Sequence, residues 1–173
     1  KEIPGDGIDN DRNGYIDDVS GWDFCGKDNT PTPDGEAPEN SHGTHVAGIV
    51  AAEAGNDLGG AGVSPEVRMV SLKWSGECRW TLDKVIKAYE YAITNEIPIV
   101  NTSFNVDGFS QTKSYQEIVK RALRAGTLIF NSAGNGYAKN SARTKIDEVL
   151  FVASTNSRDE KSRSSNFGHR VDL

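Results

Sequence analysis

The sequence predicts an α/β fold in which helices cover a mainly parallel sheet. Amphipathic helical patterns alternate along the chain with short apolar runs of strand length, and only a few residues join each pair. This alternation is typical of parallel strands joined by right-handed crossovers. The 173 residues are 36% hydrophobic and 25% charged, which fits one globular domain, and no repeat or linker divides the chain.

Residues 1–40 are expected to form loops and turns, because they are rich in Asp, Asn, Gly and Pro. Residues 15–24 are the one short strand candidate among them. The α/β core is expected over residues 41–173. It begins with a helix at His42–Glu53, with Ser41 as candidate N-cap, and the glycine-rich stretch that follows ends this helix.

Two further helices are predicted from apolar residues that recur three and four positions apart. The first is Thr81–Asn95, and the second is Ser110–Ala125 with Gly126 as its C-cap. The residues expected to form the buried stripe of the first are Leu82, Val85, Ile86, Tyr89, Ala92 and Ile93. Those expected for the second are Tyr115, Ile118, Val119, Ala122 and Leu123.

Four apolar runs are expected to form strands of the parallel sheet, one of them buried. The buried strand is expected at Ile97–Ser103, because Pro98 prevents the preceding helix from continuing. The other three are expected at Val67–Leu72, Thr127–Ser132 and Val149–Ser154.

The charge pattern excludes some partners, and the two cysteines leave the redox compartment open. The net charge is −6 without a basic stripe, so nucleic acid is not an expected partner. No apolar run approaches the roughly 18 residues that would predict a membrane span. Because no signal pattern begins the sequence, the protein is either cytosolic or has lost its signal. Cys25 and Cys78 form either free thiols or one bridge.

Three polar segments are candidates for the functional site. Residues 132–136 (SAGNG) and residues 101–105 (NTSFN) each follow a predicted strand, and ligand sites in α/β sheets gather at the carboxyl ends of strands. Residues 41–45 (SHGTH) place a histidine in the first turn of a helix. The three segments together suggest a site built from small and polar groups.

These segments, in this order, resemble the subtilisin-like serine proteases (peptidase S8). The similar stretches are SHGTHVAGIVAA at 41–52, GVSPEVRMVSLK at 62–73, LIFNSAGN at 128–135, NFGHRVDL at 166–173 and an acidic loop within 4–24. The resemblance implies a three-layer α/β/α fold with a mainly parallel sheet that is incomplete in this chain. It also implies secretion, a polypeptide substrate and an inhibitory propeptide as partners.

The resemblance assigns roles to individual residues. It implies that His42 is the general base and then general acid, and that Asn135 donates a hydrogen bond in the oxyanion hole. His45 is expected to pack structurally on the same helix. The residues implied to line the substrate cleft are Asn40, Ser103, Phe104, Asn105, Ala133 and Gly134.

Two motifs of the family are not found in the 173 residues, namely its early aspartate motif and its Gly-Thr-Ser nucleophile motif. The chain is therefore expected to be one partial catalytic domain that does not hydrolyse peptides alone. Asn105 replaces a usual glycine, which leaves the peptide preference open. An alternative is a protease-like domain that has lost catalysis and serves as a binding or scaffold module.

Residues 9–18 (DNDRNGYIDD) follow the pattern of a calcium loop, with oxygen ligands at alternate positions and glycine at the sixth. Ser20 stands where an EF-hand has its bidentate glutamate, so an aspartate at 17 or 18 would close the site. The candidate ligands are Asp9, Asp11, Asn13, Tyr15, Asp17 and Asp18. A solvated acidic loop is the alternative. The resemblance implies a second, weaker calcium site at Asn56, Leu58 and Gly60.

Overall fold

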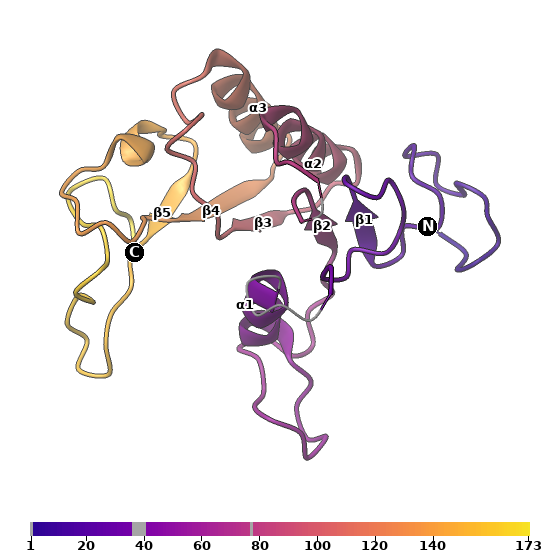
Figure 1. Cartoon of the computed structure of the whole chain (residues 1–173), viewed down its shortest axis with the longest axis horizontal. Coiled ribbons are helices and arrows are strands. Elements are labelled where there is room, and N and C mark those ends of the chain that lie inside the picture. Colours follow the sequence, from indigo (N-terminus) through magenta and orange to yellow (C-terminus); the bar gives the residue numbers. More distant parts are fainter. Residues whose placement is uncertain (1, 36–40, 77) are drawn as a thin grey trace. The chain divides into compact units, whose positions relative to one another are not determined.

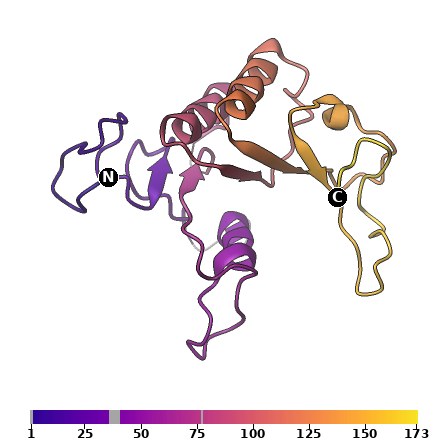
Figure 2. The same ribbon diagram turned by 180° about the vertical axis from the view of Figure 1, so that it is seen from behind.

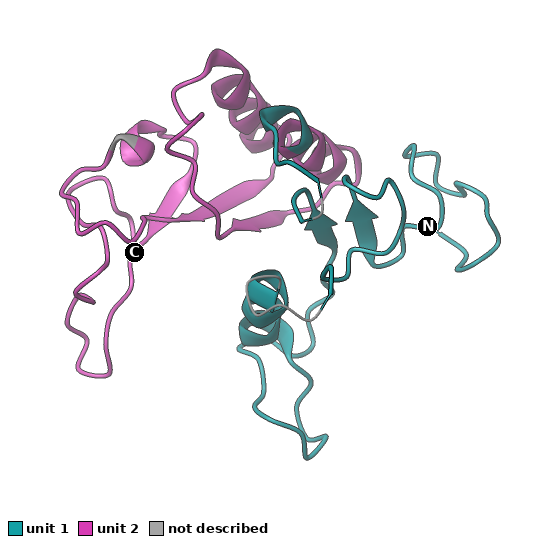
Figure 3. Ribbon diagram, viewed as in Figure 1, with its two compact units in different colours: residues 1–84 teal, residues 85–173 magenta. Residues whose placement is uncertain are grey.

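The computed structural model describes residues 2–35, 41–76 and 78–173 (Figure 1). The chain forms two compact units, residues 1–84 and residues 85–173, and each is described by itself (Figure 3). Asn40, which the sequence predicts in the substrate cleft, lies outside the described residues. Among the helices of the described residues, none is long and apolar enough to cross a membrane.

The first unit contains a short parallel sheet of β1 (Gly21–Asp23) and β2 (Ser71–Lys73). Gly21 lies opposite Ser71 with a φ of 120°, and a Cβ there would lie 1.9 Å from the Ser71 carbonyl oxygen. Only glycine therefore fits at the start of β1. The Lys73 ammonium pairs with Asp23 at 2.8 Å and with Asp34. Burial alone would lower the pKa of Lys73, but hydrogen bonds to both carboxylates raise it.

Helix α1 (His42–Ala51) also belongs to the first unit, and it ends two residues earlier than the sequence predicts. None of its residues is buried within this chain, and the Ser41 side chain makes no capping hydrogen bond. Ser41 thus occupies the predicted N-cap position without capping the helix through its side chain, because its backbone angles (φ −85°, ψ −2°) are helical in place of the extended ones that side-chain capping requires. The predicted strand at Val67–Leu72 is also shifted, to the three residues of β2.

A disulfide joins Cys25 to Cys78 with their Cα atoms 5.5 Å apart. This settles the alternative that the sequence left open in favour of one bridge. The separation lies in the ordinary range for disulfides, so the backbone accommodates the bridge without rearrangement. The bridge crosses 53 positions of sequence and ties the loop after β1 to the segment after β2.

Removal of this bridge should lower the stability of the first unit substantially. Closing a loop of this length restricts the unfolded chain, and the entropy model gives about 4 kcal/mol for that restriction. We expect the double variant Cys25→Ser/Cys78→Ser to unfold at a lower denaturant concentration than the wild type. Reduction of the wild-type protein should give the same shift. Equal unfolding midpoints for the variant and the oxidised wild type would contradict the prediction.

The second unit holds a three-stranded parallel sheet in the order β3, β4, β5. Its strands are β3 (Ile99–Thr102), β4 (Leu128–Ser132) and β5 (Leu150–Val152), and Phe130 pairs with both Asn101 and Leu150. Figures 1 and 2 show α2 (Leu82–Thr94) and α3 (Lys113–Arg124) together on one side of this sheet. The parallel pairing and the intervening helices confirm the predicted α/β class.

The core of the second unit lies between α2, α3 and the sheet. It is formed by the apolar stripes of the helices together with residues from the strands and loops, namely Val85, Tyr89, Ala92, Val106, Phe109, Tyr115, Ile118, Val119, Ala122, Ile129 and Phe151. Thr112 caps α3 by accepting a hydrogen bond from the Tyr115 amide at 3.3 Å. The C-cap of α3 is Ala125, one residue before the predicted Gly126, and Gly126 follows it with the positive φ of 93° at which a helix commonly ends.

Two burial predictions for the second unit are wrong. The strand expected to be buried is not, since Ile99 is 60% exposed and Thr102 is the one buried residue of β3. The helices cover one face of the sheet within this unit, and burial alternates along β4 accordingly. Leu123, expected in the stripe of α3, is 41% exposed because it lies at the margin of that face.

The 3-10 helix η2 (Ala142–Lys145) lies between β4 and β5, where the sequence predicts no regular element. It brings Arg143 into the interior of the unit, where the residue is 4% exposed.

Candidate active site

The candidate site is built around the turn that follows β4, residues 133–138, which we call the oxyanion segment after the role that the resemblance implies for Asn135. Gly134 has a φ of 101°, and a Cβ at this position would lie 2.6 Å from Nδ2 of Asn166 and 2.8 Å from Cζ of Arg143. Glycine is therefore required both by conformation and by space. The sharp turn leaves the next residue, Asn135, exposed.

Asn135 lies at a cavity of about 370 Å³ formed by the carboxyl ends of β3, β4 and β5. The cavity is lined by neutral groups, among them Asn101, Ser103, Ser132, Gly134, Asn135 and Ser154. The structure thus brings together three of the predicted site residues, Ser103, Gly134 and Asn135. Ala133 is buried next to them, whereas Phe104 and Asn105 do not line this cavity. Phe104 packs against Phe109 with ring centroids 6.2 Å apart.

Asn131 holds the segment that carries Ser103. Its buried side-chain amide donates to the Thr102 carbonyl at 2.6 Å and to the Phe104 carbonyl at 3.2 Å. Ser103 Oγ accepts a hydrogen bond from Asn101 at 3.0 Å. The backbone at the end of β3 is therefore fixed from both sides of Ser103.

Arg143 connects Asn105 and Asp107 to Ser132, the last residue of β4. The buried guanidinium donates to both carboxylate oxygens of Asp107, at 3.0 and 2.7 Å, and to Asn105 Oδ1 at 2.6 Å. It also donates to the Ser132 carbonyl at 3.4 Å. The hydrogen bond from Arg143 lowers the pKa of Asp107, against the opposing effect of burial. Sequence reasoning missed this pair because 36 positions separate its members.

The Arg143–Asp107 pair should make the stability of the second unit dependent on acid pH. Folding lowers the pKa of Asp107, so the ionised carboxylate adds to the free energy of unfolding at pH values above its unfolded pKa of about 3.9. This contribution is lost as the pH falls through the pKa of the folded state. We expect Asp107→Asn to lower stability at pH 7 by about 1 kcal/mol, discounted for the exposure of the carboxylate. The difference from wild type should shrink below about pH 4. Melting curves from pH 7 to pH 2 are the measurement, and a difference that grows toward acid pH would contradict it.

His42 begins α1 in the first unit and is exposed. A histidine at this position presents its imidazole to solvent or to a partner group, as proton transfer requires. His45 is exposed as well, so its predicted structural packing is wrong for the described residues. The reason is that no residue of α1 is buried by this chain.

The acidic loop brings Asp9 and Asp11 together with Glu2, a residue that the sequence analysis missed. One carboxylate oxygen from each of the three lies within 4.8 Å of those of the other two. Asp9 accepts hydrogen bonds from the amides of Asn13 at 3.1 Å and Gly14 at 2.9 Å, which folds the loop around its carboxylate. Three converging carboxylates provide the hard oxygen ligands that suit Ca²⁺.

Glu2 also ties the two ends of the loop together. Its Oε1 accepts from the amides of Asn10 at 2.8 Å and Asp11 at 3.0 Å, and its Oε2 accepts from the Asp17 amide at 2.9 Å. Glu2 lies outside the calcium pattern itself, so the spacing of that pattern could not identify it.

The other predicted calcium ligands are placed differently. The Asp17 carboxylate accepts hydrogen bonds from the amides of Gly5 at 2.8 Å and Gly7 at 3.0 Å, and the buried Asp18 accepts from the Asn13 side chain at 2.9 Å. The Tyr15 ring packs on Trp22 with centroids 5.0 Å apart. Asp17 and Asp18 thus do not join the three-carboxylate cluster in this arrangement.

The second predicted calcium site lies in an exposed loop of the first unit. Asn56 Oδ1 accepts a hydrogen bond from the Leu58 amide at 3.1 Å, and Leu58 is 74% exposed. The predicted ligands here are one side-chain amide and two backbone carbonyls, which differ in kind from the carboxylates that cluster at Glu2, Asp9 and Asp11. The site at Asn56, Leu58 and Gly60 stays a prediction.

Comparison with known proteins identifies relatives of this chain. The model of the subtilase family (Peptidase_S8) matches residues 6–173. Thermitase from Thermoactinomyces vulgaris is 32% identical over 159 residues, which cover 90% of this chain and 54% of thermitase. Subtilisin-like protease 1 from Plasmodium falciparum (isolate 3D7) is 34% identical over 137 residues, covering 78% of this chain and 19% of that protein. The chain thus spans about half or less of these relatives.

Solved structures show the same fold. The crystal structure of a lanthipeptide protease matches with a TM-score of 0.68 at 21% identity, covering 88% of this chain and 46% of that one. A protease from Pseudoalteromonas arctica PAMC 21717 matches with a TM-score of 0.63 at 23% identity, covering 74% of this chain and 41% of that one.

Proposed function

The chain belongs to the subtilase family, and from this premise we propose that it forms part of a serine endopeptidase of the subtilisin type. The observation that carries the proposal is the position of Asn135. This amide is exposed at a cavity formed by the ends of three parallel strands, on a turn that requires glycine at position 134.

In the proposed reaction a serine hydroxyl attacks the carbonyl carbon of a peptide bond. His42 takes the hydroxyl proton and later returns it to the leaving amine, so no net proton is consumed in acylation. The side-chain amide of Asn135 donates a hydrogen bond to the oxyanion that develops on the carbonyl oxygen. The backbone near Ser103 and Gly134 pairs with the extended substrate. The serine and the aspartate of the triad come from parts of the protein outside these 173 residues.

A test of this function needs the full-length protein that carries this sequence. We expect it to hydrolyse an internally quenched peptide and to become covalently labelled by an organophosphorus probe that reacts with activated serines. A folded protein that neither hydrolyses peptides nor takes the label would overturn the proposal in favour of the binding or scaffold module. The flanking sequence gives an independent check, because a serine protease requires an upstream aspartate motif and a downstream Gly-Thr-Ser.

We further propose that the acidic loop binds Ca²⁺ through Glu2, Asp9 and Asp11, because three carboxylates this close repel one another unless a cation neutralises them. A bound cation stabilises the folded loop and takes no part in proton transfer. The other ligands that the loop pattern predicts stay candidates for the same ion, namely Asn13, Tyr15, Asp17 and Asp18.

Calcium should therefore raise the melting temperature of the protein. Binding to the folded state alone contributes about 2.7 kcal/mol when free calcium is a hundredfold above the dissociation constant. The measurement is a pair of melting curves, one with calcium and one with chelator. Asp11→Ala should abolish the difference, whereas Glu66→Ala, which removes an exposed carboxylate outside the cluster, should retain it. Equal wild-type midpoints under both conditions would contradict the prediction.

The disulfide supports a location for the protein. Bridges of this kind persist in oxidising compartments, so we propose secretion or residence in the secretory pathway. The proposed partners are polypeptide substrates in that compartment and a propeptide that inhibits the enzyme until secretion.

A further inference from the structure

We propose that Asn166 is a positioning residue that holds the oxyanion segment in shape and thereby sets the direction in which Asn135 donates its hydrogen bond. The inference rests on the proposed function, since it concerns the same oxyanion hole. Asn166 itself does not line the cavity to which Asn135 is exposed.

Asn166 makes four hydrogen bonds to the oxyanion segment, and they lie on both sides of Asn135. Its side-chain nitrogen donates to the Ala133 carbonyl at 2.8 Å, and its backbone amide donates to the Gly134 carbonyl at 2.8 Å. Its side-chain oxygen accepts from the amides of Gly136 at 3.0 Å and Ala138 at 2.8 Å. The chain immediately before and after Asn135 is thus attached to one residue.

The hydrogen bonds made by the side chain at position 166 require asparagine. The side chain must provide one donor and an oxygen that accepts two hydrogen bonds. It must also pack directly on the backbone of Gly134, since a Cβ at that position would lie only 2.6 Å from Nδ2 of Asn166. Aspartate can accept from the two amides but cannot donate to Ala133. Asn166 is 4% exposed, so solvent cannot replace the hydrogen bonds that a smaller residue would lose.

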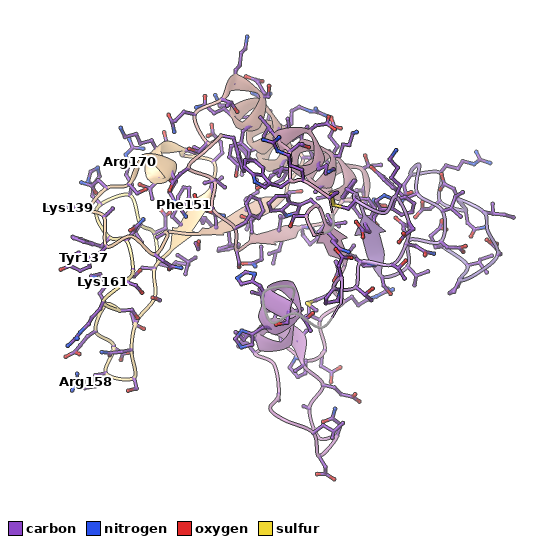
Figure 4. The ribbon with its side chains drawn as sticks, viewed as in Figure 1. Tyr137, Lys139, Phe151, Arg158, Lys161 and Arg170 are labelled. Carbon is purple, nitrogen blue, oxygen red and sulfur yellow. A yellow bond between two sulfur atoms is a disulfide. The ribbon has the colours of Figure 1, made fainter. Side chains whose placement is uncertain are left out.

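The position of Asn166 is itself fixed by its neighbours. The hydroxyl of Ser165 accepts a hydrogen bond from the Ser154 amide at 3.0 Å, just beyond β5, and the Phe167 amide donates to the Ala138 carbonyl at 3.0 Å. The Phe167 ring packs on Tyr137 with centroids 5.4 Å apart. The Lys161 ammonium lies 4.4 Å from the Tyr137 ring centroid, and Figure 4 shows these two side chains next to each other. The residue before Asn166 is thus held beside the end of β5, whereas the residue after it packs on and binds the oxyanion segment itself.

The anchoring of the segment matters because the hydrogen bond to the oxyanion is strong only when the donor is correctly placed and oriented. The donor must lie about 2.7–3.1 Å from the position that the oxyanion will occupy, and an error of about 1 Å can cost a hundredfold in rate. The contact forms mainly in the transition state, so a misdirected Asn135 lowers kcat and leaves KM nearly unchanged.

The experiment is a double-mutant cycle in the full-length protein. Asn166→Ala should lower kcat by about 10- to 100-fold with KM within about twofold of wild type. Asn135→Ala combined with Asn166→Ala should be no more than about threefold slower than Asn135→Ala alone, because Asn166 acts through Asn135. The matched control is Asn156→Ala. Asn156 also accepts two backbone amides, from Arg158 at 2.8 Å and Glu160 at 3.1 Å, but in a different turn, and its loss should leave kcat unchanged.

Hydrogen exchange of the Gly136 and Ala138 amides gives a readout that does not depend on activity. Both amides should exchange faster in Asn166→Ala, while Asn166→Asp, which keeps their acceptor, should retain their protection. If Asn166→Ala fails to fold, Asn166→Asp carries the kinetic test, and it should also lower kcat, because it loses the donor to the Ala133 carbonyl and places a carboxylate oxygen against that carbonyl in a buried position.

Additive losses in the cycle, an unchanged kcat for Asn166→Ala or unchanged exchange would each overturn the inference. A folded wild-type protein without peptidase activity would instead overturn the proposed function, and the exchange of Gly136 and Ala138 would still decide whether Asn166 anchors the segment.

Discussion

Replacement of His42 with alanine in the full-length protein is expected to lower kcat by roughly a millionfold, the size of loss that follows removal of a triad histidine from a serine protease. Alanine cannot take the proton of the attacking serine, so the nucleophile remains a weakly reactive hydroxyl. His42 is exposed at the first residue of α1, so its truncation leaves no cavity within the described chain. The loss should therefore appear in kcat while the melting temperature stays within a few degrees.

The matched control for this prediction is His45→Ala. It removes the same side chain from the same helix one turn later, also from an exposed position. We expect its kcat to remain close to that of wild type, measured on one peptide substrate for all variants. If His45→Ala abolished hydrolysis while a well-folded His42→Ala kept it, the general base would be His45.

Asn135→Ala should lower kcat by about 100- to 1000-fold with little change in KM. The serine remains activated by histidine in this variant, and the loss is that of one donor to the developing negative charge. Because the donor interacts more strongly with the oxyanion than with the carbonyl of the bound substrate, the ground state is affected less than the transition state. Asn135 is exposed, so the substitution should not disturb the core.

The measurement for Asn135 is a full set of kcat and KM values, with melting curves for each variant. A rise in KM at constant kcat would show that Asn135 binds the ground state, which contradicts its assignment as an oxyanion donor. The loss in kcat should also be larger for His42→Ala than for Asn135→Ala, since the first removes the general base and the second removes one donor.

Several features of the second unit could be predicted from sequence because they depend on local patterns. The stripes of α2 and α3 follow helical spacing, and Gly126 adopts the positive φ that ends a helix. The position of SAGN after a strand likewise follows from the order of residues along the chain, and the strand–helix alternation was sufficient to predict the α/β class.

Burial was predicted less well, because it depends on what covers a segment and not on the segment itself. Ile99 lies in a strand as apolar as its neighbours, yet it is exposed because the helices cover one face of the sheet. The expected packing of His45 fails in the same way, because no residue of α1 is buried in this chain. Apolar composition alone does not identify the covered face.

The sequence by itself therefore determined the fold class, the main helices and the chain order of His42, Ser103 and Asn135. Only the tertiary structure decided which residues support them. Asn166 contacts residues about 30 positions earlier, Arg143 reaches Asp107 across 36 positions, and Cys25 pairs with Cys78 across 53. Such pairs have no local periodicity. Their members meet because parallel strands and crossovers bring distant turns to the same edge of a sheet, and hydrogen-bond geometry then selects the side chain that fits.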